Sequence, residues 1–453
     1  MLNLLSKKVK ELKELSLLRL YGTMQIDEKG ILNIGGVKTT ELAEEYGSPL
    51  IVIDEKEIEN NINQYQKGFE DYPGRSRIIY ASKAFANRTL YRILNRNGLS
   101  LDVVSGGELY TALKAGFPTE KIYFHGNNKL PSEIEMALEN SIGRFFIDNI
   151  QEARLLNKIA KQKNEKVKAL IRLTPGIEAH THEFIMTGQI DSKFGVSIEN
   201  GDAMELVSVI EELDNIELTG IHAHIGSQIY ERVAYIKLIE IMIKFMTEIR
   251  EQKGYVLTQL DLGGGLGIPQ TEDDPDLPIE DFINDLVEKI IEECKKKSFP
   301  LPELAVEPGR SIVGTAGTTL YTVGMIKEID NIKKYITIDG GMTDNIRPAL
   351  YGADYDGFLA NRCQKEEVET VTIAGKCCES GDILIEDLKL PVAKTGDLLA
   401  VPCTGAYSYA LSSNYNSIPR PAVVLVKDGR SNIIIKRESY KEIISNDIIP
   451  EGY

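Results

Sequence analysis

Short runs of β-branched and aromatic residues alternate with longer amphipathic segments through the first two thirds of the 453-residue chain. The amphipathic segments include residues 108–115, 150–161 and 281–297. Eight apolar runs occur, at residues 78–80, 100–104, 121–124, 144–148, 167–173, 219–225, 259–262 and 304–307. Strands that alternate with helices form parallel sheets, and eight repeats favour closure into a (β/α)8 barrel of the α/β class. A doubly wound open sheet is the alternative.

The pattern changes after about Arg310, where Gly, Pro and Asn separate short strand-like runs. These runs, at residues 311–323, 335–338, 370–374, 397–401 and 422–426, predict an all-β domain. Residues 31–53 are also strand-like and would join it, which places the barrel between two parts of the β domain. The predicted division is a helical extension at 1–22, a segment contributing to the β domain at 23–53, a barrel at 54–310 and a C-terminal β domain at 311–453.

Composition narrows the possible partners of the chain. The net charge of −16 comes without a basic stripe, so a nucleic-acid partner is disfavoured. Five irregularly spaced cysteines favour a reducing compartment over a disulfide framework. No apolar run is long enough to span a bilayer, and residues 1–20 predict a surface helix rather than a signal peptide. We therefore expect a cytoplasmic protein with no membrane partner.

Polar residues stand where several predicted strands end, which is where barrel enzymes carry their reactive groups. Lys83 follows the first strand, and a lysine there is suited to covalent catalysis once its amine is desolvated. Asp261-Leu-Gly-Gly-Gly-Leu-Gly267 closes the seventh strand and Glu307-Pro-Gly-Arg310 the eighth, so these loops predict a phosphate site. A carboxylate beside that site is suited to holding a pyridine nitrogen protonated. A lysine considered alone is more often a solvated surface residue.

Two His-x-His pairs compete with this interpretation. His180 and His182 form one pair, and His222 and His224, at the end of the sixth strand, form the other. Strand alternation turns His222 and His224 toward the barrel interior. A zinc hydrolase needs histidines and carboxylates that converge, and none of the five histidines stands beside the carboxylates of strands seven and eight. We therefore expect no metal, with the ring of His224 lying flat on another ring.

The β domain carries Cys377-Cys378-Glu379-Ser-Gly-Asp382. Neighbouring residues of an extended segment point in opposite directions, so at most one of the two thiols can face a given site. A buried structural cysteine is the usual case, but a thiol near a cation can donate a proton.

With these motifs the chain resembles the fold-type III pyridoxal phosphate (PLP) dependent decarboxylases, the alanine-racemase-like group, and within it the diaminopimelate decarboxylase family. The resemblance extends from about residue 35 to about residue 415. The motifs that carry it are Tyr80-Ala-Ser-Lys83, Leu101-Asp-Val-Val-Ser-Gly-Gly-Glu108, His180-Thr-His-Glu183, Asp191-Ser-Lys-Phe-Gly195, His224-Ile-Gly-Ser-Gln228, Gly263-Gly-Gly265, Glu307-Pro-Gly-Arg310, Cys378-Glu-Ser-Gly-Asp382 and Gly405-Ala-Tyr407.

The resemblance implies roles for the residues at the barrel mouth. Lys83 would carry PLP covalently, His224 would stack on its ring, and Glu307 would hold the pyridine nitrogen. The implied phosphate ligands are Ser227, Gly265, Gly309, Arg310 and Tyr407, and the implied supports of the cofactor pocket are Asp102 and Glu108.

The resemblance also implies a homodimer, in which the β domain delivers Cys378 and Glu379 across the interface into the partner's site. Cys378 would return a proton to the substrate carbon after CO2 leaves. Cys377 directly precedes it, but the family pattern, with the cysteine immediately before Glu-Ser, favours Cys378.

The implied reaction converts meso-2,6-diaminopimelate to L-lysine and CO2, the last step of lysine biosynthesis. This substrate has a second amino-acid centre, whose carboxylate needs a bidentate cation and whose ammonium needs an acceptor. Arg310 and Arg347 would supply the cation and Glu379 the acceptor, with Tyr351 and Tyr407 as further substrate-binding groups. Ornithine has no distal carboxylate, and buried arginines would repel its amine.

Other functions remain open at this point. The first is a decarboxylase of the same fold that acts on ornithine, arginine, lysine or carboxynorspermidine. A racemase of this fold is disfavoured by the carboxylate of Glu307, since an arginine at the pyridine nitrogen is what weakens the electron sink. A metal-dependent hydrolase would use both His-x-His pairs, and a non-catalytic PLP carrier would need only the barrel.

Overall fold

The computed structural model describes residues 19–177, 192–363 and 368–453, which form two compact units. The barrel unit contains Asn61–Gly267 and Leu277–Ile312. The β unit contains the described residues up to Asn60 together with Ile268–Asp276 and Val313–Tyr453. Most of the predicted N-terminal helix, and the pair His180 and His182, lie outside the described residues.

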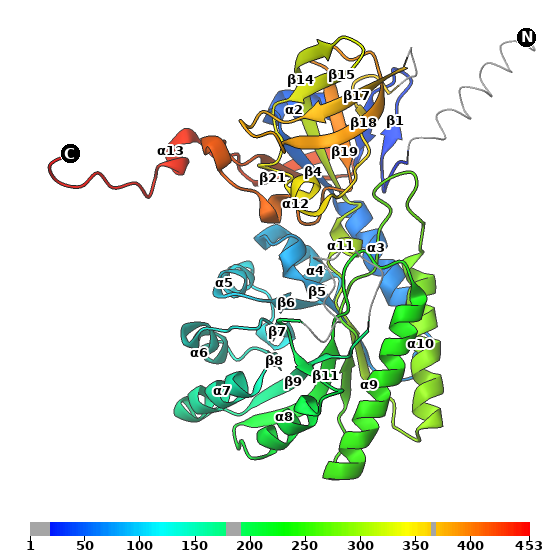
Figure 1. The fold of residues 1–453 in the computed structure, drawn as a ribbon, viewed down its shortest axis with the longest axis vertical. Helices are drawn as coiled ribbons and strands as arrows, with labels where there is room; N and C mark the ends of the chain where they lie inside the picture. The colour runs from blue at the N-terminus through cyan, green and yellow to red at the C-terminus, as the bar shows by residue number, and fades with distance from the viewer. Residues whose placement is uncertain (1–18, 178–191, 364–367) are drawn as a thin grey trace, which may run out of the picture. The chain divides into compact units, whose positions relative to one another are not determined.

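Eight parallel strands of the barrel unit close into a ring (Figure 1). Each strand pairs with its successor, β8 pairs with β9, and β13 pairs with β5. The strands are β5 (Ser76–Ala81), β6 (Ser100–Val103), β7 (Ile122–Phe124), β8 (Arg144–Ile147), β9 (Val167–Thr174), β11 (Ile216–Ala223), β12 (Gln259–Asp261) and β13 (Glu303–Val306). The short β10 (Val196–Ser197) is added at the edge of β9. All eight predicted strands are present, so the barrel is confirmed and the open sheet is not formed.

Helices connect the barrel strands, and polar caps start several of them immediately after a strand ends. Asn87, Ser105 and Asn149 each accept a hydrogen bond from a backbone N–H in the first turn of the following helix, which satisfies an otherwise unpaired donor. The connecting helices are α4 (Arg88–Arg96), α5 (Gly106–Ala115), α6 (Pro131–Glu139), α7 (Ile150–Lys163), α8 (Asp202–Glu211), α9 (Arg232–Lys253) and α10 (Ile279–Lys296), and α3 (Glu55–Gly68) precedes the first strand. The loops between strand and cap therefore stay short and hold polar side chains at the barrel mouth.

The β unit is built around one long strand, β14 (Gly317–Ile329), which pairs with β15 (Lys333–Ile338), β19 (Leu398–Pro402) and β4 (Leu50–Asp54). β4 comes from the N-terminal segment and also pairs with β20 (Ala422–Lys427), so this segment is part of the sheet as expected. The other strands are β1 (Gln25–Ile26), β2 (Leu32–Ile34), β3 (Val37–Lys38), β16 (Phe358–Leu359), β17 (Val368–Ala374), β18 (Ile383–Pro391) and β21 (Arg430–Ile435). The predicted fold class, a barrel with a separate β domain, is confirmed.

Two predictions about the β domain are wrong in detail. Residues 311–323 are not one strand, because α11 (Arg310–Val313) forms first and β14 begins only at Gly317. Asn61 and Tyr65 of α3 bind Ile312 and Ser311, which stabilises this turn. The unit is also not purely β, since α2 (Thr39–Tyr46), α12 (Arg347–Tyr351) and α13 (Tyr440–Ile443) belong to it. None of the helices in the described ranges has the length and apolar character that a membrane span requires.

Candidate active site

The mouth of the barrel gathers side chains from strands that are far apart in the sequence. Lys83 lies in the one-turn helix η1 (Ser82–Ala84) directly after β5, with its side chain exposed. Asp102 is buried within β6. Burial and the charge of Glu307 raise the pKa of Asp102, while the charge of Lys83 opposes this shift. Burial and then the charge of Lys83 hold the pKa of His224 well below its usual range. The charge of Lys83 therefore acts on both side chains.

Glu307 follows β13 and contacts two buried histidines. His222 Nε2 donates a hydrogen bond to Oε2 at 3.1 Å, and His125 Nε2 lies 2.6 Å from Oε1. Burial alone would raise the pKa of Glu307, but the two imidazoles hold it well below its usual range. Burial lowers the pKa of His125 to about 3, so its ring is neutral at pH 7.

The expectation that no histidine lies beside Glu307 is therefore wrong. His125 and His222 are far from Glu307 in the sequence. Closure of the barrel brings His125, after β7, and His222, in β11, to Glu307 at the end of β13. His125 was missed altogether, although its place directly after the third predicted strand was a usable signal. Arg172 of β9 was also missed, and its charge acts on the pKa of both Glu307 and His222.

His125, His222 and Glu307 are also the kind of group that can bind a metal ion. Two ligands at about 2.1 Å from a tetrahedral zinc ion are separated by roughly 3.4 Å. The 2.6 Å between His125 Nε2 and Glu307 Oε1 is much shorter, so the two atoms are in direct polar contact. His224 is not directed at this group, because its Nδ1 accepts a hydrogen bond from the backbone N–H of Gly264 at 3.2 Å.

The loops after β11, β12 and β13 contain glycines at positions where the Cβ of any other residue would collide with neighbouring backbone, so the backbone itself is accessible there. A Cβ at Gly264 would lie 2.1 Å from the carbonyl oxygen of Glu307, and one at Gly265 would lie 2.5 Å from that of Gly226. Gly265 also has a φ of +115°, which side chains disfavour. Arg310 Nη2 donates to Ser227 Oγ at 3.0 Å, so a cation and a hydroxyl lie beside this cradle. The structure thus groups four of the predicted phosphate ligands: Ser227, Gly265, Gly309 and Arg310.

The remaining predicted residues lie in the β unit. The guanidinium of Arg347 is buried and donates to Tyr355 Oη at 2.7 Å, and Tyr351 ends the same helix, α12. Tyr407 occupies a turn with a φ of +63°. Glu379 is exposed.

Cys377 and Cys378 lie in a bend and not in an extended segment, so the alternation argument does not apply to them. The N–H of Cys377 donates to Asp382 Oδ2, and the N–H of Cys378 donates to Asn416 Oδ1, both at 2.8 Å. Asp382 also accepts from the N–H of Met342 at 2.6 Å. One carboxylate thus ties the thiol loop to the segment that leads to Arg347. Cys378 is exposed and Cys377 is half-buried.

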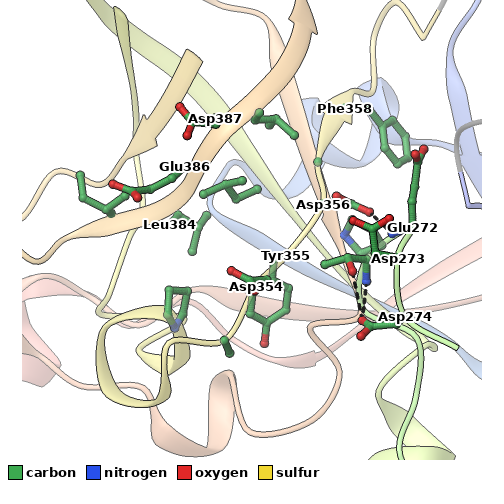
Figure 2. Close-up of a pocket in the computed structure, with 18 of the residues that line it drawn as sticks. Glu272, Asp273, Asp274, Asp354, Tyr355, Asp356, Phe358, Leu384, Glu386 and Asp387 are labelled. Carbon is green, nitrogen blue, oxygen red and sulfur yellow. Dashed lines mark hydrogen bonds between the residues drawn. The ribbon is translucent and has the colours of Figure 1, made fainter. Parts of the chain in front are cut away.

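A cavity of about 850 Å³ opens within the β unit (Figure 2). Its lining is strongly acidic: the carboxylates are Glu272, Asp273, Asp274, Asp354, Asp356, Glu386 and Asp387. Two of these carboxylates hold a loop of the protein in place, because Asp274 and Asp356 accept hydrogen bonds from backbone N–H groups of residues 270–272. A cavity of this charge repels carboxylate substrates, and none of the predicted reactive residues lines it.

The chain is similar to pyridoxal-dependent enzymes over most of its length. The model of the family "Pyridoxal-dependent decarboxylase, pyridoxal binding domain" matches residues 55–314. The diaminopimelate decarboxylase of Bacillus subtilis (strain 168) is 47% identical over 429 residues, covering 95% of this chain and 98% of the relative. That of Bacillus methanolicus is 48% identical over 418 residues, covering 92% and 97%. The crystal structure of the M. jannaschii diaminopimelate decarboxylase with L-lysine has a TM-score of 0.88 at 37% identity, covering 94% and 98%.

A closed parallel barrel with a separate β domain, together with these matches, defines the class of the chain as the fold-type III pyridoxal-dependent decarboxylases. Within that class, the chain belongs to the diaminopimelate decarboxylase family.

The residues of the barrel mouth fit the PLP that this family implies. Oε1 of the buried Glu307 has no aligned hydrogen-bond donor among the described residues, although His125 approaches it closely, so it can accept a ring N–H. The hydrogen bond to Nδ1 fixes the orientation of the His224 ring, and burial keeps this ring neutral. The glycine cradle beside Arg310 and Ser227 suits a phosphate.

Proposed function

We propose that this enzyme decarboxylates meso-2,6-diaminopimelate to L-lysine and CO2 with pyridoxal 5'-phosphate carried on Lys83. The observation that carries the proposal is the set of Lys83, His224 and Glu307 directly after strands β5, β11 and β13 of one barrel, in a chain 47% identical to a named diaminopimelate decarboxylase over 95% of its length. The M. jannaschii relative was crystallised with L-lysine, the product of this reaction.

Each barrel residue has a distinct task in the proposal. When bound, PLP accepts the electron pair that the departing CO2 leaves on the substrate carbon. Glu307 stays ionised and would hold the ring nitrogen in its protonated form, which strengthens that acceptor. Lys83 would anchor the cofactor, and His224 would lie against its ring. Asp102 and Glu108 would support the pocket near the amine of Lys83.

The phosphate of the cofactor would be held by the glycine cradle and the neighbouring cation. The backbone at Gly265 and Gly309, the hydroxyl of Ser227 and the guanidinium of Arg310 lie in the barrel unit. Tyr407 of the β unit would add a further hydroxyl to the phosphate or the substrate.

The distal end of the substrate would be recognised by the β unit. Arg347, with Arg310, would clamp the distal carboxylate, and Tyr351 and Glu379 would bind around the distal ammonium. Cys378 would donate the proton that replaces CO2. Because Cys378 and Glu379 are exposed on this chain, they are accessible for action in the site of a partner subunit, so we propose a homodimer. We also propose that the enzyme is cytoplasmic.

The nearest alternative is a related decarboxylase that acts on ornithine, arginine, lysine or carboxynorspermidine. CO2 release should be measured from each of these and from meso-diaminopimelate, with L-lysine quantified as the product. We expect meso-diaminopimelate to be preferred by at least about 10²-fold in kcat/KM, because the others lack the distal carboxylate that a buried guanidinium binds. Equal or faster turnover of ornithine would overturn the proposed substrate.

Lys83→Ala tests the anchor. The variant should lose the visible absorbance of lysine-bound PLP and lose activity by at least about 10³-fold, since a covalent step is removed. A suitable control is Lys114→Ala, since this lysine is exposed on α5, and the variant should keep both the absorbance and the activity. Lys129→Ala would be a poor control, because Lys129 is buried against Glu152. Absorbance that persists in Lys83→Ala would place the cofactor elsewhere.

A further inference from the structure

The two imidazoles that contact Glu307 approach it from different sides of the barrel. His125 follows β7, which is separated from β13 by β5 and β6, and His222 lies in β11, separated from β13 by β12. Phe146 of β8 packs against both imidazole rings. Its ring is stacked on that of His125, with 3.5 Å between centroids, and meets that of His222 edge-on at 5.0 Å. The positions of both rings are therefore set by the apolar core of the barrel.

Three buried carboxylates share this space. Asp102 of β6 and Asp261 of β12 face Glu307 closely enough that its charge, together with burial, raises the pKa of each. Like charges at close range in a low-dielectric interior cannot all be present, so some of the three groups are protonated. The question for the cofactor is which carboxylate keeps the negative charge.

The distribution of hydrogen-bond donors answers that question. Asp102 Oδ1 and Asp261 Oδ2 have no aligned hydrogen-bond donor among the described residues, and Asp261 Oδ1 accepts from the N–H of Gly263. The carboxyl of Asp261 also interacts with Glu307 itself, which raises the pKa of Asp261 further. Glu307 Oε2 accepts a hydrogen bond from His222 at 3.1 Å, and His125 Nε2 makes a close polar contact with Oε1 at 2.6 Å. Hydrogen bonds to a carboxylate favour its charged form. Among the three carboxylates of this cluster, Glu307 is thus the one that the protein stabilises as an anion.

The other charged groups around the cluster do not make this selection. Arg172 of β9 acts on Glu307 and Asp102 alike, and its Nε lies 4.0 Å from Oδ1 of Asp148, which follows β8. Lys83 acts on Asp102, and its charge also disfavours protonation of His224 at the end of β11. These cations lower the cost of holding one negative charge in the cluster, whereas the imidazoles of His125 and His222 contact Glu307 itself.

We propose that His125 and His222 are a pair of positioning residues that select Glu307 as the anionic member of the cluster and so keep the ring nitrogen of bound PLP protonated. This inference rests on the proposed function only for the presence of PLP, not for the identity of the substrate. His222 makes no hydrogen bond through Nδ1 among the described residues, so its bond to Glu307 is the one that replacement removes.

The test uses the full-length enzyme loaded with PLP that carries 15N at the ring nitrogen. In His125→Phe/His222→Phe the ring stack on Phe146 is kept and both N–H donors are lost. We expect the 15N signal to move from the pyridinium to the neutral pyridine position at pH 7.5, with the PLP still attached. In His125→Gln/His222→Gln an amide N–H can replace each donor, and we expect the pyridinium signal to return.

Turnover provides a second measurement. The Phe/Phe variant should lose on the order of 10²-fold in kcat, with a much smaller change in KM, because the electron sink is weakened and the substrate contacts are kept. The single variants His125→Phe and His222→Phe, one donor each, supply the same comparison if the double variant does not fold by circular dichroism. A pyridinium signal unchanged in a folded Phe variant, or stoichiometric metal in wild type that the variants lose, would overturn the inference.

The two proposals fail in different ways. Wild-type enzyme that shows the pyridinium signal but does not turn over meso-diaminopimelate overturns the proposed substrate and leaves the role of the histidines intact. Wild-type enzyme that makes L-lysine with a neutral ring nitrogen overturns the role of the histidines and leaves the substrate intact.

Discussion

Each unit of this protein buries a cluster of carboxylates, and the two clusters are in opposite states. In the barrel unit, two imidazoles hold the pKa of Glu307 low despite its burial. In the β unit, Asp344 is fully buried, with its main side-chain partner the hydroxyl of Tyr321, and burial raises its pKa to about 7. The comparison teaches that burial raises the pKa of a carboxyl, and that the kind of partner decides whether this shift is reversed. The two imidazoles reverse it at Glu307, whereas the hydroxyl and backbone donors of Asp344 do not.

The clusters also differ in what they hold in place. Oε1 of Glu307 has no aligned hydrogen-bond donor among the described residues, so it can accept one from a bound cofactor. Asp382 of the β unit uses its oxygens on backbone N–H groups, and so shapes the loop of Cys377 and Cys378. The barrel cluster thus sets the charge of Glu307, whereas the carboxylate of Asp382 in the β unit fixes the conformation of the loop that carries Cys377 and Cys378.

The largest expected effect is that of Glu307→Gln. The neutral amide cannot hold a ring nitrogen protonated, so we expect kcat to fall on the order of 10³-fold with PLP still bound. Activity and the absorbance of the bound PLP should be measured together. As a control, Glu303→Gln changes a carboxylate at the start of β13, the strand that Glu307 follows. Glu303 pairs with Arg77, and this variant should keep most of the activity. Equal losses in both variants would show that Glu307 acts through stability alone.

The thiol loop of the β unit is expected to come next. Removing a proton donor costs typically 10²-fold or more, so Cys378→Ala should lower kcat by about 10²-fold. Cys377→Ala should change it by less than about threefold, because the half-buried thiol packs beside Asp382 and burial raises its pKa to about 12. Steady-state kinetics of the two variants separates the adjacent cysteines, and the reverse order of losses would assign the donor to Cys377.

A smaller effect is expected when a substitution in the β unit keeps the positive charge of a side chain but changes the shape of that side chain. Arg347→Lys retains the cation and loses the planar fork, so kcat/KM for meso-diaminopimelate should fall by about 10- to 100-fold, mostly through KM. Arg362→Lys alters an arginine of the same unit that pairs with Asp397, and its KM should not change. An unaltered KM in Arg347→Lys would remove Arg347 from the proposed substrate site.

The smallest effect on catalysis is expected from Asp344→Asn. This substitution tests whether the carboxyl of Asp344 is protonated in the folded protein, in contrast to that of Glu307. In the folded protein this carboxyl has a pKa of about 7, whereas in the unfolded chain it loses its proton near 3.8, the ordinary pKa of an aspartate. The folded state binds more protons between these pH values, so the free energy of unfolding falls as pH rises from about 4 to 7 and is level above.

The total change attributable to this group is at most about 4 kcal/mol. Urea unfolding followed by circular dichroism across this pH range should show the slope in wild type, and a weaker slope in Asp344→Asn, whose amide oxygen can still accept from Tyr321. An identical slope in both proteins would mean that Asp344 is already ionised at low pH, and the contrast with Glu307 would be lost.

Several parts of the fold could be read from local patterns because they depend on local interactions. Each barrel strand is a short apolar run, and caps such as Ser105 and Asn149 mark where the next helix begins. The helical turn at Arg310–Val313 was missed because it depends on α3, whose Asn61 and Tyr65 bind it from about 250 residues away in the chain. The bend at Cys377 was missed for the same reason, since a side chain and not a strand neighbour binds its N–H.

By itself, the sequence determined the eight strand–helix repeats, the strand-end positions of Lys83, His224 and Glu307, and the glycines of the anion cradle, because periodicity and strand ends are local properties. Only the tertiary structure decided that His125 and His222 meet Glu307, and that two other carboxylates compete with it for the charge. The physical reason is that charge in a buried cluster depends on distances across a closed barrel. Residues nearly 200 positions apart, His125 and Glu307, reach contact only when the last strand pairs with the first.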